Sequence, residues 1–514
     1  MSMVKSLVIV GGGTAGWLTA GILAAQFQSR IQAGQLSITL CESANVPTVG
    51  VGEGTWPTMV TTLKAMGISE TDFLRHCEVS FKQGSKFVNW GTESGDFYYH
   101  PFDIPNGAFE GLCPTYWLNT ASGTAYAQQF SSQFDICEAG LAPKTITTPE
   151  YANYAHYGYH LNAGAFSTFL QKHCIAKLGV RHCVDDVTDV TLATNGNIES
   201  ISLKEYGVLA ADLFVDCTGF KSLLLGKALN VEFVDVNDVL FADTALAAQV
   251  AYPTDDAPIK SYTQSTAQDA GWIWDIGLPT RRGVGHVFSS QHMDEDKAIK
   301  TLEHYIKQSG GTFDPDTIRK ISFRAGHRKH FWHKNCVAIG LSAGFLEPLE
   351  ASALVLVELS ANMLAEQLPN TQADMPIRAQ RFNDKFAYRW SRAIEFLKLH
   401  YVLSERQSAF WQDNRAAESI PSRLQDLLTL WQHDVPKLTD FDATGELFQA
   451  ASYQFVLYGS SYRSKLLQNV EASHMQYIEQ QLQQNQLKTQ QLLSTLPSNR
   501  ELLNKVQKFG FAKI

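Results

Sequence analysis

Three glycines near the start of the chain have the spacing that binds a dinucleotide. Gly11, Gly13 and Gly16 fit the pattern G-x-G-x-x-G. The first glycine allows a tight turn, the second lets the backbone approach a pyrophosphate, and the third lets a helix pack closely on a strand. Amide groups at the start of such a helix carry partial positive charge and bind phosphate oxygens. We therefore expect these glycines, with Thr14 and Ala15, to hold a dinucleotide cofactor.

The residues around the glycines have the pattern of a strand, a turn, a helix and a second strand. Leu7–Val10 is a short apolar run with β-branched residues, which is typical of a buried parallel strand. Residues 17–27 predict a helix, and residues 36–40 predict a strand that ends at Cys41 and Glu42. A carboxylate at this position accepts hydrogen bonds from an unphosphorylated ribose, which favours FAD or NAD over NADP. The alternative is a glycine-rich turn with a structural role alone.

Two later glycine turns favour FAD over NAD. Residues 216–219 (DCTG) follow a strand predicted over residues 210–215, and residues 340–344 (GLSAG) follow one predicted over residues 335–339. Both look like the turns with which two-domain flavoproteins return to the cofactor, although the second lacks the aspartate often found there. Their order along the chain is more informative than either turn alone. We expect Leu341, in the second turn, to contact the FAD.

Bulk composition excludes several classes of protein. The chain has 514 residues, of which 45% are hydrophobic and 18% charged, so it is globular and long enough for more than one domain. A formal net charge of -9 disfavours a general binder of nucleic acid or acidic membranes. The 8 cysteines form no C-x-x-C pair, and His173-Cys174 and His182-Cys183 lack the spacing of zinc ligands, so we expect ordinary thiols and no metal. No stretch reaches the roughly 20 apolar residues of a membrane span, and we expect a cytoplasmic protein.

The second half of the chain predicts helices. Residues 351–493 have a mainly helical pattern with few prolines. Leucines recur through the glutamine-rich residues 476–491, which favours a helix with a polar face. Earlier, residues 187–203 predict two strands around a turn at Asn195-Gly196.

The fold class that follows is α/β, with interleaved domains because no linker clearly divides the chain. We expect a Rossmann-like FAD-binding domain of the two-domain flavoprotein monooxygenase type over residues 1–350, with inserted sheet segments on the substrate side. A mainly helical region over residues 351–514 is expected to complete the substrate site.

Four stretches together resemble the flavin-dependent halogenases of the tryptophan halogenase family. The resemblance spans nearly the whole chain and weakens after about Trp390. Residues 51–55 (VGEGT) and 100–102 (HPF) also fit the family. The four stretches are residues 11–17 (GGGTAGW), 81–90 (FKQGSKFVNW), 272–276 (WIWDI) and 345–352 (FLEPLEAS).

The resemblance implies a flavin that makes an oxidant for chemistry done elsewhere. A separate flavin reductase supplies FADH2, oxygen adds to give a flavin hydroperoxide, and a bound chloride or bromide attacks the peroxide to give hypohalous acid. The acid passes through an internal tunnel to a lysine. That lysine presents it, as a haloamine or by hydrogen bonding, to an electron-rich aromatic ring. The implied partners are the reductase and a small aromatic substrate, without nucleic acid or membrane, and a homodimer is left open.

The catalytic residues that the resemblance implies are Lys82 and Glu350. Phe81 and Phe87 make the surroundings of Lys82 partly apolar, and burial lowers the pKa of a lysine and frees a nucleophilic amine. From composition alone a surface lysine is the simpler interpretation. Glu350 matches the family's active-site glutamate, which polarises the oxidant or takes the proton from the halogenated ring. Glu347 lies three residues earlier, and position in the motif favours Glu350.

A tryptophan pair matches a family motif that lies near the flavin. Trp272 and Trp274 are two residues apart and on a strand would point the same way. In the family this motif is thought to keep substrate away from the flavin, which separates halogenation from monooxygenation; the alternative is a pair of core tryptophans. The family pattern ends in Ile-Pro, whereas Gly277 follows Ile276 here. Gly52 is implied to contact the FAD.

The sequence departs from the family at the halide site. The family has Ser-Thr-Gly after its glutamate, and amides of the last two residues hold the halide. Here Ala351-Ser352-Ala353 follows Glu350. The amides of Ser352 and Ala353 can still bind a halide, but Ala353 cannot easily adopt conformations open to glycine, so we expect an altered site.

A second departure concerns the substrate. Members that use free tryptophan carry a late glutamate, a Phe-Trp pair and then Asn-Tyr-Tyr. The nearest match, residues 443–454, has Ala443 for the glutamate, unless Glu446 substitutes, and Leu447-Phe448 for the pair. It ends in Ser452-Tyr453-Gln454. An ammonium without a buried carboxylate partner binds poorly, so free tryptophan is not expected.

An indole or a larger aromatic fits better. His100, Pro101, Phe102 and Phe448 predict a wall for a flat ring. A flavin monooxygenase or dehydrogenase on the same fold is the alternative, but hydroxylation needs no remote lysine. A non-enzymatic FAD-binding or sensory protein is disfavoured because the lysine, the glutamate and the tryptophan pair are intact.

Overall fold

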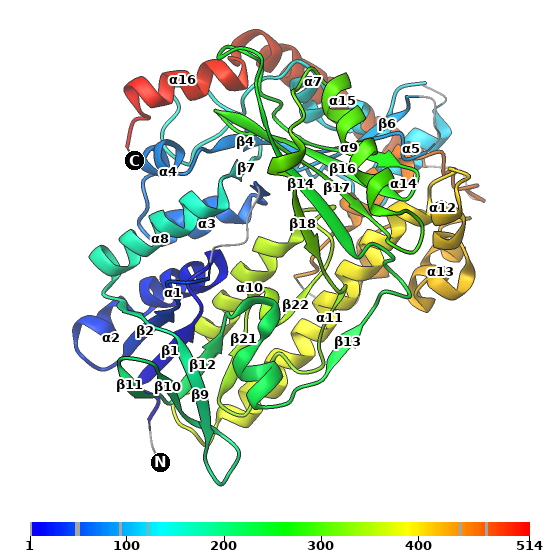
Figure 1. Ribbon diagram of the computed structural model, residues 1–514. Coiled ribbons are helices and arrows are strands. Elements are labelled where there is room, and N and C mark those ends of the chain that lie inside the picture. The colour runs from blue at the N-terminus through cyan, green and yellow to red at the C-terminus, as the bar shows by residue number, and fades with distance from the viewer. Residues whose placement is uncertain are drawn as a thin grey trace. The chain divides into compact units, whose positions relative to one another are not determined.

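Each of the two units of the fold is assembled from three separate stretches of the chain. Blue, green and yellow segments of the ribbon therefore lie together in the first unit (Figure 1). The computed structural model describes residues 3–46, 52–91, 95–120, 123–441, 445–467 and 471–513. Unit 1 consists of residues 1–79, 161–236 and 324–390, and unit 2 of residues 80–160, 237–323 and 391–514. The division into an FAD-binding domain over residues 1–350 and a helical region over residues 351–514 that completes the substrate site stays a prediction.

Unit 1 is built on a mainly parallel sheet, which confirms the α/β, Rossmann-like fold class. Its strand order is β20-β21-β12-β1-β2-β8, with β20 antiparallel to β21 and the other pairs parallel. In β1 the residues from Leu7 to Val10 are all buried, as expected for a parallel strand covered on both faces. The strands are β1 (Ser6–Val10), β2 (Ser37–Glu42), β8 (Arg181–Val184), β12 (Leu213–Asp216), β20 (Trp332–His333) and β21 (Cys336–Ala338).

Two predicted boundaries in unit 1 are wrong. Helix α1 (Thr14–Gln26) begins three residues before the predicted helix because Gly13 caps it. The strand predicted over residues 210–215 is two strands, since Ala210 ends β11 (Gly207–Ala210). Asp212 lies between β11 and β12 and accepts hydrogen bonds from the amides of Lys5 and Ser6, at 2.8 and 3.0 Å. These side chain–backbone bonds interrupt the strand.

The rest of unit 1 consists of two small sheets and the helices around the main sheet. The hairpin predicted over residues 187–203 is confirmed as the antiparallel pair β9 and β10. Helix α1 packs against both α8 and α10 (Figure 1). The elements are α2 (Gln28–Gln32), β3 (Glu53–Gly54), α3 (Thr58–Ala65), α4 (Glu70–His76), α8 (Ala163–Leu178), β9 (Val187–Leu192), β10 (Ile198–Leu203), β13 (Phe233–Asp235), β19 (Gly326–Arg328), β22 (Gly344–Phe345) and α10 (Ser352–Glu366).

Unit 2 contains a seven-stranded sheet of order β18-β14-β17-β16-β15-β5-β6. Its pairs are antiparallel except that β5 runs parallel to β15. A separate antiparallel pair joins β4 (Ser80–Lys82) to β7 (Gly158–Leu161). The strands of the large sheet are β5 (Gly84–Val88), β6 (Phe97–Pro101), β14 (Thr244–Ala251), β15 (Thr263–Gln268), β16 (Gly271–Gly277), β17 (Arg281–Phe288) and β18 (Arg319–Ser322).

The mainly helical pattern predicted after residue 351 is confirmed. The glutamine-rich residues lie in α15 (Ala472–Thr495), of which Ile478, Thr489 and Leu492 are buried. Among the described residues, no helix combines the length and apolarity needed to cross a membrane. The remaining helices are α5 (Leu112–Asn119), α6 (Tyr126–Phe130), α7 (Ser132–Glu138), α9 (Glu295–Gln308), α11 (Met375–Val402), α12 (Ala409–Asn414), α13 (Ser422–Leu430), α14 (Ala450–Gly459) and α16 (Asn499–Phe509).

A buried carboxyl group joins α10 to α3 within unit 1. Glu358 is 1% exposed and accepts hydrogen bonds from the hydroxyls of Thr58 and Thr62, at 3.0 and 2.5 Å. Burial raises the pKa of Glu358 from 4.5 to about 7, against the smaller opposing effect of the two hydroxyls. Between about pH 4.5 and pH 7, the Glu358 carboxyl therefore keeps its proton in the folded protein, whereas the same group has lost it in the unfolded chain.

We expect Glu358→Gln to remove a pH dependence of stability. Because the folded-state pKa is raised, the free energy of unfolding falls as pH rises from about 4.5 to about 7 and is level above that. Relative to wild type, the glutamine variant should gain up to ~3 kcal/mol between pH 5 and pH 8. Denaturant unfolding at the two pH values measures this, with exposed Glu366→Gln on the same helix as control. Parallel wild-type and variant curves would contradict the assignment.

Candidate active site

The glycine turn after β1 has the geometry that a pyrophosphate requires. Gly11 has a φ of +113°, and a Cβ there would lie 2.2 Å from the carbonyl oxygen of Cys217. A Cβ on Gly16 would lie 1.9 Å from the carbonyl oxygen of Gly11, so helix and turn are in contact. A Cβ on Gly13, the residue that caps α1, would meet nothing within 4 Å. The fold thus requires the outer two glycines, and open space adjoins the middle one.

Thr14 and Ala15 are the first two residues of α1, so their amides have no acceptor within the helix. The side chain of Thr14 is buried and its hydroxyl donates to the carbonyl of Ala163 at 3.4 Å. These amides and the helix dipole suit an anionic group placed beside Gly13.

Glu42 is oriented at the end of β2. Its Oε1 accepts from Nε2 of Gln171 at 3.0 Å and lies 2.7 Å from Nε2 of His182. Its Oε2 lies against Gly12, where a Cβ would come within 1.5 Å of it. One carboxylate oxygen is therefore fixed by the protein, and the carboxylate lies beside the glycine turn, as a ribose acceptor must. His182 is a partner of Glu42 that the sequence did not suggest.

The two later turns follow parallel neighbours of β1. Because β12 and β21 run parallel to it, their carboxyl ends lie at the same sheet edge as the glycine turn. A Cβ on Gly340 would lie 2.6 Å from the Cβ of Ala15, so the second turn abuts the start of α1. Leu341 is partly exposed within that turn. In the first turn, the Asp216 carboxylate accepts from the amides of Leu224 and Leu225, so its role there is to shape the turn.

This edge of the sheet fits a dinucleotide such as FAD. It combines free amides, a glycine without a neighbouring obstruction, and an oriented carboxylate. Gly52 is buried with a φ of +139°, while Val51, in the same predicted stretch of residues 51–55, lies outside the described residues.

Helix α10 begins at Ser352, the last residue of the motif that contains Glu350. Glu350 is 3% exposed, and its backbone carbonyl accepts a hydrogen bond from Nε1 of Trp56 at 2.8 Å. Ser352 and Ala353 are the first two residues of this 15-residue helix, so their amides have no acceptor within it. Ala353 is helical, a conformation that alanine adopts without strain, and the altered halide site stays a prediction. The positive φ, +54°, falls on Ala351, which caps the helix.

Lys82 is buried in β4 of unit 2. It is 1% exposed, and its Nζ lies 5.5 Å from the centre of the Phe102 ring. Phe81 contacts Tyr157 and Tyr159, and by strand alternation it faces away from Lys82. The apolar environment predicted from Phe81 is therefore supplied by Phe102 instead.

His160 lies beside Lys82 and was not suggested by the sequence. In the β4–β7 pair, Ser80 is opposite His160 and Lys82 is opposite Gly158, so Lys82 and His160 are diagonal neighbours on one face. Nε2 of His160 lies 2.8 Å from the Thr263 hydroxyl. Burial, and then the charge of Lys82, hold the pKa of His160 well below its ordinary value, so this imidazole is neutral at pH 7.

The predicted aromatic wall is partly assembled in unit 2. The ring of Phe448 stacks on Phe396 with centroids 3.8 Å apart, and His100 lies 5.7 Å from Phe396. Pro101 lies opposite Gly84 at the end of β6, next to Phe102. Phe396, on α11, thus lies against both His100 and Phe448, which are far apart in the sequence. The only sign of Phe396 in the sequence was an aromatic residue within a stretch of helical pattern.

In the late segment, the side chain of Gln454 is bonded to the protein. Nε2 of Gln454 donates to the carbonyls of Ala108 and Pro436, and its Oε1 accepts from Tyr126. Gln454 is thus committed to structure. Ala443 lies outside the described residues.

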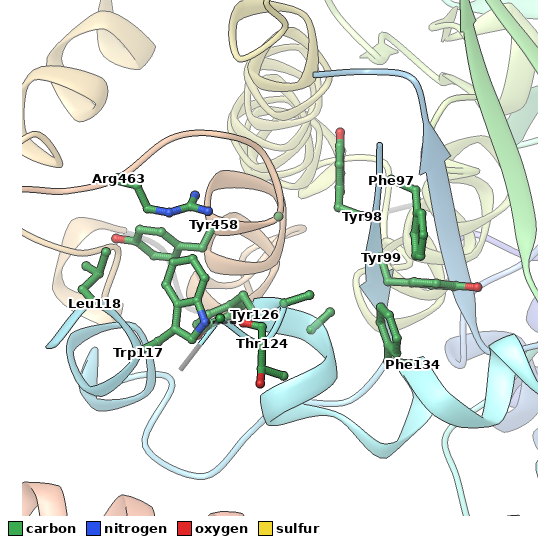
Figure 2. Close-up of a pocket in the computed structure, with 14 residues that line it drawn as sticks. Phe97, Tyr98, Tyr99, Trp117, Leu118, Thr124, Tyr126, Phe134, Tyr458 and Arg463 are labelled. Carbon is green, nitrogen blue, oxygen red and sulfur yellow. Dashed lines mark hydrogen bonds between the residues drawn. The ribbon is translucent and has the colours of Figure 1, made fainter. Parts of the chain in front are cut away.

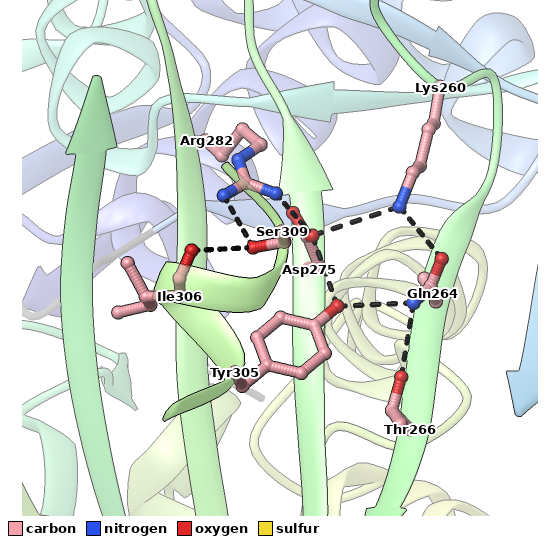
Figure 3. A network of polar contacts seen from close by, with 8 residues as sticks. All are labelled: Lys260, Gln264, Thr266, Asp275, Arg282, Tyr305, Ile306 and Ser309. Carbon is pink, nitrogen blue, oxygen red and sulfur yellow. Dashed lines mark hydrogen bonds and ion pairs between the residues drawn. The ribbon is translucent and has the colours of Figure 1, made fainter. Parts of the chain in front are cut away.

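The tryptophan pair shares one face of β16, as predicted. Trp272 and Trp274 are 0% and 5% exposed, with ring centroids 6.4 Å apart. On the other face, Oδ2 of buried Asp275 accepts from Arg282 at 2.9 Å and from the Tyr305 hydroxyl at 3.1 Å (Figure 3). Nζ of Lys260 lies 3.8 Å from the same oxygen. This network fixes the strand that carries the tryptophans.

We expect Asp275→Asn to destabilise the protein by about 3–5 kcal/mol. The substitution leaves Arg282, whose side chain is only 12% exposed, without its carboxylate partner. Chemical unfolding measures the loss, and exposed Asp255→Asn, the control, should change stability by no more than about 0.5 kcal/mol. Equal effects of the two substitutions would show that the network is not important for stability.

Ala351 and Ala353 should respond in opposite ways to glycine. Ala351→Gly relieves a left-handed backbone and should stabilise the fold by about 1 kcal/mol. Ala353→Gly places glycine in a helix and should destabilise it by up to about 1 kcal/mol. Thermal unfolding of the two variants measures the difference. A loss of stability in Ala351→Gly would contradict the strained cap.

Comparison with known proteins agrees with the geometry. The family model described as tryptophan halogenase matches residues 6–475. A solved tryptophan halogenase from Shewanella frigidimarina is 46% identical, with a TM-score of 0.96 covering 100% of this chain and 99% of its own. A flavin-dependent halogenase structure from Xanthomonas campestris is 30% identical, with a TM-score of 0.85 covering 100% and 99%.

Characterised sequences agree. Tryptophan 7-halogenase RebH of Lentzea aerocolonigenes is 33% identical over 436 residues, which is 80% of this chain and 79% of RebH. The 7-chloro-L-tryptophan 6-halogenase KtzR of Kutzneria sp. is 33% identical over 452 residues, 84% of this chain and 85% of KtzR. The chain therefore belongs to the tryptophan halogenase family and is a flavin-dependent halogenase.

Proposed function

We propose that this halogenase converts chloride or bromide to hypohalous acid and that Lys82 delivers the halogen to an electron-rich, indole-like ring. The observation that carries the proposal is the burial of the Lys82 amine beside the Phe102 ring and neutral His160. Burial in general disfavours the charged form of an amine, and the unprotonated form is the nucleophile.

The residues of unit 1 would hold the cofactor and the halide. Bound FAD, reduced by a separate flavin reductase, supplies the oxidising equivalent from molecular oxygen. The amides that follow Gly13 would bind the pyrophosphate, Glu42 would bind the ribose, and Gly52 and Leu341 would contact the FAD. The amides of Ser352 and Ala353, at the positive end of α10, would hold the halide.

Lys82 would act in either of two ways. As a nucleophile, its nitrogen takes the halogen from hypohalous acid, and hydroxide leaves and takes the amine proton to form water. As a hydrogen-bond donor, the lysine would hold the acid intact. In both cases a ring carbon then bonds to the halogen and the ring loses a proton, for which Glu350 is the proposed acceptor. Neutral His160 adds no second positive charge beside the amine.

The substrate that we propose is an indole or a larger aromatic rather than free tryptophan. RebH and KtzR are named for tryptophan substrates. Here Ala443 replaces the family's glutamate and Gln454 is bonded to the protein, so the ammonium of an amino acid has fewer partners. His100, Phe102 and Phe448 instead offer ring surface. Trp272 and Trp274 are proposed to keep this substrate from the flavin, and the cytoplasm, where reductases supply reduced flavin, is the proposed location.

We expect Lys82→Ala to lose halogenated product by at least about 100-fold. The assay contains a flavin reductase, NADH, FAD, indole and either chloride or bromide, and mass spectrometry reads the products. Lys86→Ala, which removes a lysine paired with Glu138 on the next strand, is the matched control and should stay within about twofold. Circular dichroism verifies that both variants fold.

Two outcomes would contradict the proposal. Halogenation that survives Lys82→Ala would remove the lysine from delivery. Hydroxylated product that survives the substitution would point to an aromatic monooxygenase instead.

A further inference from the structure

Half of the residues that line a pocket of about 400 Å³ in unit 2 are aromatic, and the pocket shares no residue with the wall described above. We call it the Trp117 pocket. Its volume lies in the range of sites for small organic molecules. Figure 2 shows Trp117, Tyr126, Tyr458 and Arg463 on one side and Phe97, Tyr99 and Phe134 on the other. Its lining residues are Phe97, Tyr98, Tyr99, Trp117, Leu118, Gly123, Thr124, Ala125, Tyr126, Ala127, Phe134, Tyr458, Gly459 and Arg463.

Contacts among the rings hold each wall in place. On one side the centroid of Tyr126 lies 5.6 Å from Trp117 and 5.4 Å from Tyr458. On the other, Phe134 lies 5.1 Å from Tyr99 and 6.1 Å from Phe97. Walls that are already packed lose little conformational entropy when a flat ligand enters between them.

The polar ends of the lining rings are already used by the protein. The Tyr98 hydroxyl lies 2.8 Å from Nδ1 of His400, and Nε1 of Trp117 donates to the carbonyl of Thr124 at 2.9 Å. The hydroxyls of the other tyrosines are also hydrogen-bonded. Their partners are Glu138 for Tyr99, Gln454 for Tyr126 and Ser464 for Tyr458. The pocket therefore presents ring surfaces, which favour a flat aromatic ligand.

The charge of the pocket is positive. Among the described residues of the lining, Arg463 is the charged member and none is a carboxylate. Its guanidinium lies 4.6 Å from the centre of the Trp117 ring, and its Nη1 donates to the carbonyls of Ser460 and Tyr462 at 2.8 and 2.6 Å. Nη1 is thus anchored, while Nε and Nη2 donate to no acceptor among the described residues. Glu138, behind Tyr99, is paired with Lys86 at 2.6 Å.

We propose that the Trp117 pocket binds a flat aromatic ligand that carries a carboxylate or another anionic group. The ring lies between the aromatic walls, and the anion accepts hydrogen bonds from Arg463. An aromatic cation is disfavoured, because the guanidinium already occupies the Trp117 face and repels positive charge. The Trp117 pocket is thus a second site for aromatic molecules, in addition to the one proposed at Lys82.

Calorimetric titration of the full-length, FAD-loaded protein tests the proposal with indole-3-acetate, indole and tryptamine as probes. We expect indole-3-acetate to bind most tightly and tryptamine least tightly. Ala125→Trp, which fills the pocket from its rim, should weaken indole-3-acetate binding at least tenfold. Gln128→Trp, at an exposed position of helix α6, which Ala125 caps, should leave it unchanged.

A charge substitution keeps the test valid if Ala125→Trp fails to fold. Arg463→Gln, at an exposed position, should weaken binding of indole-3-acetate about tenfold and leave indole binding unchanged, whereas nearby exposed Lys465→Gln should change neither. Unchanged binding in Ala125→Trp or Arg463→Gln, or tryptamine binding as tightly as indole-3-acetate, would overturn the proposal. The titration measures binding and requires no turnover. Lys82→Ala protein must therefore still bind indole-3-acetate in the Trp117 pocket, even if the proposed delivery of halogen by Lys82 fails.

Discussion

The burial of the Lys82 amine is the constraint on which the substrate-side chemistry depends. The Lys82 side chain is 1% exposed, so the residues around it must accommodate an ionisable amine that has little contact with solvent. The fold supplies a ring face from Phe102 and an imidazole that stays uncharged at His160. The unprotonated amine is the form that accepts a halogen cation equivalent.

Unit 1 depends on a different constraint, which is the meeting of parallel strands at one edge. β1, β2, β12 and β21 all end at that edge, so turns distant in the sequence converge there. Glycine is required where backbone atoms come too close for a Cβ, as at Gly11 and Gly16. Where the chain needs a charge, as at Glu42, the protein orients the carboxylate with Gln171 and His182.

Much of this was predictable from local patterns, and the remainder depends on contacts between distant segments. The strand–glycine–helix unit, the hairpin over residues 187–203 and the shared face of the tryptophan pair follow from spacing within a few residues. The neighbourhood of Lys82 does not, because β4 has three residues, which is too short to give a periodic signal, and its partner β7 lies far along the chain. Phe396, on α11, likewise meets Phe448, which lies just before α14, only in the folded chain. The left-handed backbone at Ala351 was not predicted, because it depends on α10 beginning at Ser352, and the start of a helix is set by its packing as well as its sequence.

The central claim is that Lys82 acts in the first of the two ways proposed, as a nucleophile whose nitrogen carries the halogen before it reaches the ring. Peptide mapping by mass spectrometry, after turnover with halide but without an aromatic substrate, tests this directly. The account predicts halogen on the peptide that contains Lys82, and none on the corresponding peptide of the Lys82→Ala protein. Halogen on other peptides alone, with the Lys82 peptide unmodified, would contradict the account.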